Sequence, residues 1–204
     1  MIADGYTVVP PGKIASVVTY LEMRSAASLA ANDRTDLAMR RVVHPELDWY
    51  RTLYKKIGAE WLWFGRLRLS DAELRALLDD ERYDIWVLTA DGDDAGLLEL
   101  DCRVPAEIEI SYFGVGSELI GKGAGKYLLS HALQTAWTHR PERVWLHTCN
   151  LDHPRALGFY RAAGFVPYKY AIEVADDPRL TGLLPETAAP HVPIVRSGIP
   201  PTPP

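Results

Sequence analysis

Apolar and polar residues alternate along the chain in two periods, which predict strands and helices. Apolar side chains at every second position, or in short runs, indicate strands; these are expected at residues 14–23, 84–90, 96–103, 107–115, 144–149 and 165–174. Spacings of three and four indicate helices, which are expected at 46–57, 70–78, 121–139 and 154–163. Early strands follow one another through turns and later ones alternate with helices, which predicts an α/β domain with a mixed sheet.

Local signals mark several ends of these elements. Ser70 and Glu73 have the spacing of a capping box at the start of a helix. Pro154 suits a first helical turn, and Gly164 suits the position after a helix. The turn at 91–94 is expected to close a β-hairpin.

The end of the chain differs from its middle. More than half of the 15 prolines fall within residues 177–204, and proline fits neither helix interiors nor central strands. We therefore expect a single domain over 1–176 and a Pro-rich C-terminal tail over 177–204. The tail is expected to lie over the surface or to be mobile, and docking on a partner domain is the alternative.

Composition narrows the class of protein. Of the 204 residues, 48% are hydrophobic and 24% charged, which is typical of globular proteins. The net charge of -5 argues against a nucleic-acid partner. Two cysteines give no disulfide framework, and the six histidines show no ligand spacing, so no metal is expected. Without a signal-peptide pattern or a long apolar run, the chain is expected to be cytoplasmic, with no membrane contact.

A Gly- and Lys-rich turn after the strand at 107–115 carries the strongest chemical signal. Gly121, Gly123 and Gly125 stand there with Lys122 and Lys126, at the start of a predicted helix. The first N–H groups of a helix are unpaired donors at the positive end of its dipole, and glycine lets a ligand approach them. The turn is therefore expected to hold a phosphate or pyrophosphate.

Two common phosphate motifs fit this turn incompletely. Residues 116–122 follow the Walker A spacing, but Gly123 replaces the hydroxyl residue that would bind magnesium. A dinucleotide fingerprint would need a different glycine spacing after a parallel βαβ start. A degenerate phosphate loop in a nucleotide-binding protein stays as an alternative.

Two motifs in order resemble the GNAT superfamily of acyl-CoA-dependent N-acyltransferases. Gly123 and Gly125 match the glycines of its first motif, [QR]-x-x-G-x-[GA], in which Ile120 replaces Gln or Arg. The second motif, A-x-x-x-Y-x-x-x-G-F, is matched after the next predicted strand by Ala156, Tyr160, Gly164 and Phe165. A further departure is His153, where the family commonly has Asn. The likeness is strong over 84–170, and over 14–83 it rests on element order.

The resemblance implies a central mixed, mostly antiparallel sheet flanked by helices, and acetyl-CoA as acyl donor. The backbone at Phe113, Gly114 and Val115 would hold the pantetheine arm, with an N–H near Val115 facing the thioester oxygen. The pyrophosphate would lie on Gly121, Lys122, Gly123, Ala124, Gly125 and Lys126. His153 would contact the cofactor or cap the helix that follows it.

Transfer to an amine needs a base and an acid. Glu109 stands before Val115 on the same predicted strand, where histone-type members of the family place their catalytic glutamate, and Glu107 is the alternative base. Tyr160 would protonate the leaving thiolate, by analogy with the family. A helix-face tyrosine in the core is the competing interpretation.

The acceptor site is the least defined part of the sequence. Trp61 and Trp63, in an aromatic-rich segment, are candidates for its wall, although such clusters are commonly core. Glu22 is a further candidate, and Tyr20 a weaker one. The acceptor is expected to be a small-molecule amine or a protein amine, and a homodimer is compatible with the family. A non-catalytic CoA-binding sensor is the alternative to an enzyme.

Overall fold

The computed structural model describes residues 4–26 and 34–198. Its elements are β1 (Lys13–Met23), β2 (Leu37–Val42), α1 (Leu47–Gly58), η1 (Ala59–Trp61), α2 (Asp71–Leu78), β3 (Tyr83–Ala90), β4 (Asp93–Asp101), β5 (Glu107–Val115), η2 (Ser117–Leu119), α3 (Ala124–Thr138), β6 (Arg143–Cys149), α4 (Ala156–Ala162) and β7 (Val166–Asp176). Each predicted strand and helix is present, with shifted ends. The capping box is confirmed: the Ser70 side chain accepts from the Glu73 N–H, and the Glu73 carboxylate accepts from the Ser70 N–H.

The seven strands form one sheet in the order β2-β3-β4-β5-β6-β1-β7. All neighbours are antiparallel except β5 and β6. The sheet is therefore mixed and mostly antiparallel, as predicted. The sequence analysis missed β2, a short edge strand that pairs only with β3 and exposes Arg40 and Arg41.

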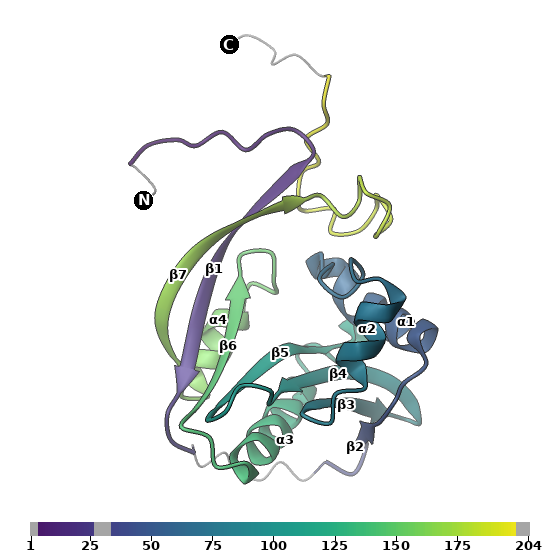
Figure 1. Cartoon of the computed structure of the whole chain (residues 1–204), viewed down its shortest axis with the longest axis vertical. Coiled ribbons are helices and arrows are strands. Elements are labelled where there is room, and N and C mark those ends of the chain that lie inside the picture. The colour runs from purple at the N-terminus through teal and green to yellow at the C-terminus, as the bar shows by residue number, and fades with distance from the viewer. Residues whose placement is uncertain (1–3, 27–33, 199–204) are drawn as a thin grey trace.

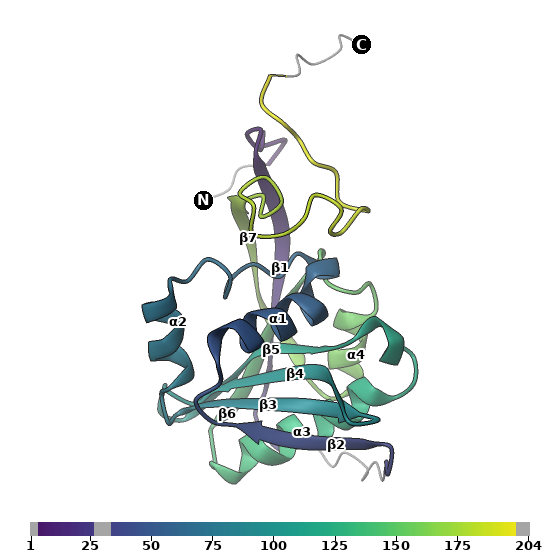
Figure 2. The same cartoon turned by 90° about the vertical axis from the view of Figure 1, so that its right-hand side faces the viewer.

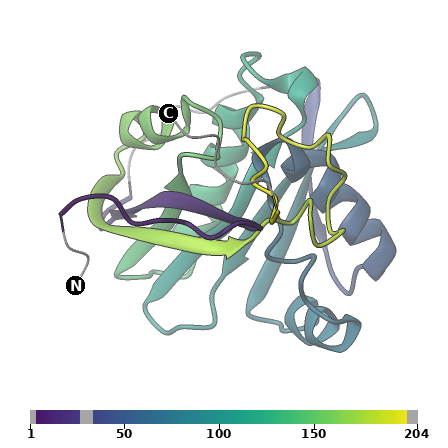
Figure 3. The same cartoon turned by 90° about the horizontal axis from the view of Figure 1, so that it is seen from above.

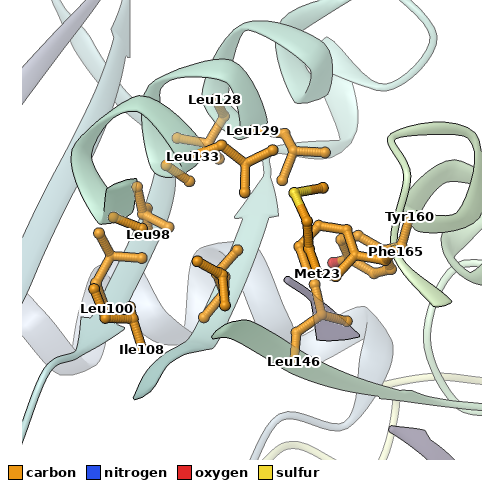
Figure 4. Close-up of a cluster of buried hydrophobic side chains, with 14 of the residues drawn as sticks. Met23, Leu98, Leu100, Ile108, Leu128, Leu129, Leu133, Leu146, Tyr160 and Phe165 are labelled. Carbon is orange, nitrogen blue, oxygen red and sulfur yellow. The ribbon is translucent and has the colours of Figure 1, made fainter. Parts of the chain in front are cut away.

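Helices cover both faces of the sheet (Figure 2). On one face, α3 packs its leucines on β4, β5 and β6, and Tyr160 and Phe165 extend this core toward α4 (Figure 4). On the other face, α1 and α2 enclose a second core around Tyr50, Tyr54 and Leu74. Burying both sheet faces in this way gives one domain with two hydrophobic layers.

The C-terminal segment folds back over the molecule beside α1 (Figure 3). Leu184, Ala188 and Ala189 join the core of α1 and α2. Arg179, whose side chain is 1% exposed, pairs with Asp177 at 2.7 Å and donates to the carbonyls of 188, 189 and 192. Residues 177–192 thus add a packed segment to the domain. The terminal prolines of the predicted tail lie outside the described residues.

Candidate active site

The sheet divides at its parallel pair. β5 and β6 pair only from Glu107 with Arg143 to Glu109 with Trp145. Beyond that point β5 runs on to Val115 with β4, and β6 runs on to Cys149 with β1 (Figure 1). Residues 110–115 therefore have a strand edge that faces no neighbouring strand of the described chain. Such an edge can hydrogen-bond an extended ligand as another strand would.

A cavity of about 1060 Å³ lies at this division of the sheet. It is lined by β5, β6 and β1, by the turn before α3, and by α4 and the segment after α1. Small-ligand sites are usually about 300–1,000 Å³, so this cavity accommodates a large ligand. Its extent from the glycine turn to β6 suits a ligand with a phosphate end and an extended arm.

The glycine turn has the geometry of an anion site. Gly121 and Gly123 have φ values of 79° and 85°, which favour glycine. Gly121, Gly123, Gly125 and Lys126 line the cavity, next to the N-terminus of the 15-residue α3. The side chains of Lys122 and Ala124 do not line it: the Ala124 methyl is in the core, and the Lys122 carbonyl accepts from Arg34 at 2.7 Å. The Lys122 N–H donates to the Leu119 carbonyl at 3.2 Å, so of these two residues only the Ala124 N–H is suited to bind phosphate.

Tyr160 lines the cavity from α4, with its ring between Phe113, Phe159 and Phe165. Burial, and then the Asp152 carboxylate, raises the pKa of its hydroxyl well above the ordinary value of 10. The hydroxyl is therefore protonated at neutral pH, as a proton donor must be. The Tyr160 side chain is part of the core and also lines the cavity, so its role as an acid stays a prediction.

Glu109 lies where β5 and β6 separate. Its carboxylate is 3.7 Å from Nδ1 of His147 on β6, and His147 lines the cavity. Burial, and then the Asp101 carboxylate, raises the pKa of Glu109 from 4.5 to about 7. Burial lowers the pKa of His147 below 6.5, so the imidazole is neutral at pH 7. Of these two proton acceptors, His147 lines the cavity and Glu109 does not, so Glu109 is connected to the cavity through the imidazole.

The sequence analysis gave His147 no catalytic role. Its link to Glu109 depends on the parallel register of β5 and β6, which the sequence pattern does not give. Glu107, the alternative base, is bound to Arg143 at 2.7 Å and does not line the cavity. Glu109 does not line the cavity either, but its carboxylate is next to His147, which does, whereas the Glu107 carboxylate is held by Arg143.

The segment after α1 forms one wall of the cavity. Trp61 and Trp63 both line it. Trp63 contacts Tyr54 and Tyr112, and the ring of Trp61 lies edge-on to that of His153, with 5.3 Å between their centres.

His153 also lines the cavity, and its Nδ1 accepts from the Arg155 N–H at 3.1 Å in the turn before α4. The N-cap of α4 is Arg155, and no side chain among the described residues caps this helix. The predicted acceptor residues on β1 lie elsewhere. Glu22 and Tyr20 do not line the cavity: Glu22 is bound to Arg24 and Arg143, and Tyr20 stacks on Trp145.

A buried ionic network behind this wall was not anticipated. Glu99 is fully buried and accepts from Tyr50 and Tyr83, and Arg66 pairs with it at 3.0 Å. The Arg66 guanidinium also lies 4.6 Å from the ring centre of Tyr112, which lines the cavity. The network therefore fixes the wall from behind.

Asp84, Cys102 and His139 have ligand atoms within 4.8 Å of one another, away from the cavity. Arg41 already pairs with Asp84 at 2.5 Å. Burial, followed by Asp84 and Asp101, raises the pKa of the Cys102 thiol to about 11, which keeps it protonated. These three residues are therefore not suited to bind a metal ion as they stand.

Comparison with known proteins gives the class. The model of the Acetyltransferase (GNAT) family matches residues 48–165, more than half of the chain. The chain therefore belongs to the GNAT acetyltransferase family. No curated protein matches it. Within the described residues, no helix has the length and hydrophobicity to cross a membrane.

Solved structures share the fold at low identity. A GCN5-related N-acetyltransferase from Sphaerobacter thermophilus aligns with TM-score 0.58 and 19% identity over 82% of this chain and 53% of its own. An aminoglycoside acetyltransferase from an uncultured soil metagenomic sample aligns with TM-score 0.53 and 20% identity, over 63% and 88%. An IAA acetyltransferase from Bacillus cereus gives 0.51 and 22%, over 65% and 79%. This chain spans less than two thirds of several other neighbours, between 52% and 63% of their length.

Proposed function

We propose that the protein is an N-acetyltransferase that moves the acetyl group of acetyl-CoA to a primary amine. The observation that carries the proposal is the divided sheet, whose open β5 edge leads from the glycine turn to the pair of Glu109 and His147. Membership of the acetyltransferase family supports acetyl as the group transferred.

The donor fits the residues present. The N–H groups of 121 and 123–125 and the Lys126 ammonium would hold the pyrophosphate, and the backbone of 113–115 would hold the pantetheine arm. The N–H groups of 122 and 126 already donate to the carbonyls of 119 and 123. Bound acetyl-CoA would supply an activated acyl group as a thioester. An N–H near Val115 would stabilise the negative charge that develops on the thioester oxygen, an effect worth about 3–4 kcal/mol where such donors have been removed.

Transfer of the acetyl group needs a base that takes a proton from the acceptor and an acid that gives one to the leaving sulfur. An alkylammonium acceptor has an ordinary pKa of about 10.4, so it must lose a proton before its nitrogen can attack. Glu109, directly or through His147, would take that proton. As the C–N bond forms and the C–S bond breaks, the Tyr160 hydroxyl would protonate the departing sulfur. The attacking nitrogen loses a second proton as it becomes an amide, and this proton restores the Tyr160 hydroxyl. Trp61 and Trp63 would face the acceptor.

Calorimetric titration with acetyl-CoA, with Mg-ATP as a control, tests the donor. A panel of small amines and lysine peptides, with detection of released thiol, then tests transfer. We expect selective binding of acetyl-CoA and thiol release with at least one amine. Binding without release for every amine would favour a CoA sensor, and binding of Mg-ATP alone would favour the phosphate-loop alternative.

A further inference from the structure

β7 is a long edge strand whose outer side faces no other strand of the described chain (Figure 1). It has 11 residues and pairs only with β1. Tyr170, Ile172 and Val174 on one of its faces are 70%, 51% and 53% exposed. Proteins usually protect long edges with charges, proline or a covering element, because an open edge pairs with another chain. The opposite edge, β2, is shorter and carries two exposed arginines, whereas the exposed Lys169 and Glu173 of β7 have opposite charges.

We propose that β7 pairs antiparallel with β7 of a second copy of this chain, with Ala171 on the two-fold axis. In a two-fold antiparallel pair, the axis passes through one residue, and residues equally far on either side face each other. With Ala171 at the centre, Lys169 faces Glu173 of the partner subunit, and Glu173 faces the partner's Lys169. Two ion pairs of opposite charge follow from one register.

The neighbouring registers lack this match. A register with residue 169 or residue 173 on the two-fold axis places like charges opposite each other, which destabilises a strand pair. Centres at 170 or 172 place Lys169 opposite an alanine. The Ala171 register also sets Tyr170 opposite Ile172 of the partner subunit, an aromatic and β-branched pair that stabilises sheets.

The side chains of Lys169 and Glu173 are available to contact a second copy of the chain. The β1–β7 register is regular from Lys169 to Asp176, and its irregularity lies beyond Tyr20. Lys169 and Glu173 are both exposed, and neither forms an ion pair with another described residue. The Lys169 Nζ lies 3.8 Å from the centre of the Tyr20 ring, on the sheet face that it shares with Glu173. Glu173 also lines the cavity, so the partner's Lys169 would lie at its rim.

Sedimentation velocity of the full chain and of three variants tests the proposal. We expect the wild type to dimerise, and Lys169→Glu or Glu173→Lys to raise the dimer dissociation constant by about tenfold or more, since each places like charges opposite each other twice. The double variant Lys169→Glu with Glu173→Lys restores opposite charges and should restore the dimer. Lys55→Glu, an equal charge change on the exposed side of α1, should leave association unchanged.

Three results would overturn the pairing. These are a wild type that stays monomeric at all concentrations, single variants that associate as the wild type does, and a double variant that folds but does not recover. Circular dichroism separates misfolding from lost association. The side chains at both positions are exposed, so the core is unaffected and each variant is expected to fold.

Discussion

At the scale of a single residue, the proposed role of Glu109 as the base connects its protonation to activity. Its pKa of about 7 means that it becomes a base as the pH rises through neutrality. We expect kcat/KM to rise with pH and to level off above about pH 7. Glu109→Gln should lower kcat about 100- to 10,000-fold while the calorimetric affinity for acetyl-CoA stays unchanged. A variant with wild-type kcat would exclude Glu109 as the base.

The same carboxyl makes a prediction about stability. Because its pKa is raised on folding, the folded protein binds more protons than the unfolded chain between pH 4.5 and about 7. The free energy of unfolding therefore falls as the pH rises through this window. Glu109→Gln should be more stable than the wild type at pH 8, by about 1–3 kcal/mol, and little different at pH 4. Urea denaturation at both pH values measures this, and an equal difference at both would contradict it.

At the scale of elements, the proposed function places donor binding at the start of α3. Gly123 has a φ of 85° and lines the cavity. A valine there would strain the backbone and fill the space next to the N–H groups, so Gly123→Val should abolish acetyl-CoA binding in calorimetry. Gly92→Val is the matched control, because Gly92 has a φ of 89° in the β3–β4 turn, outside the cavity lining. If both variants bind equally, the turn is not the phosphate site.

At the same scale, the sequence predicted some parts of the site and missed others. The glycine turn and the α4 motif were found because each is a contiguous pattern whose chemistry is local. Tyr160 and Gly123 therefore fell in the cavity as expected. The partnership of Glu109 with His147 was missed because it depends on the register of two strands that a whole helix separates in the sequence. Glu22 was misjudged because Arg143, 121 residues away, takes up its carboxylate.

At the scale of the whole molecule, the C-terminal segment contributes more to the stability of the fold than its proline content suggested. Proline content predicted a surface tail, but Arg179 anchors residues 177–192 through contacts that only the folded chain brings together. Arg179→Met would remove the cation that pairs with the buried Asp177 carboxylate, which would keep only the backbone N–H of residue 179, and would remove the side-chain donor to the carbonyls of 188 and 192. We expect a loss of about 3–5 kcal/mol in the free energy of unfolding.

Arg82→Met is the control for this prediction. Arg82 forms the same local pair with Asp80, two residues before it, but its side chain is 64% exposed. Its loss should cost less than about 1 kcal/mol. Urea denaturation measures the free energy of unfolding of both variants. Equal losses would mean that the buried Arg179 pair stabilises the fold no more than the exposed Arg82 pair.

The division of the sheet has a consequence for motion. Only three residue pairs join the halves between β5 and β6, so strain across the middle is resisted mainly by the layers of side chains. A bound arm along β5 would act as a splint between the halves. Amide hydrogen exchange followed by mass spectrometry should show slowed exchange at 110–115 and 146–149 when acetyl-CoA is added, with β3 unchanged. Uniform slowing throughout the chain would argue against a local splint. If the slowing is confined to these strands, the bound donor would hold the two halves of the sheet together in addition to supplying the acetyl group.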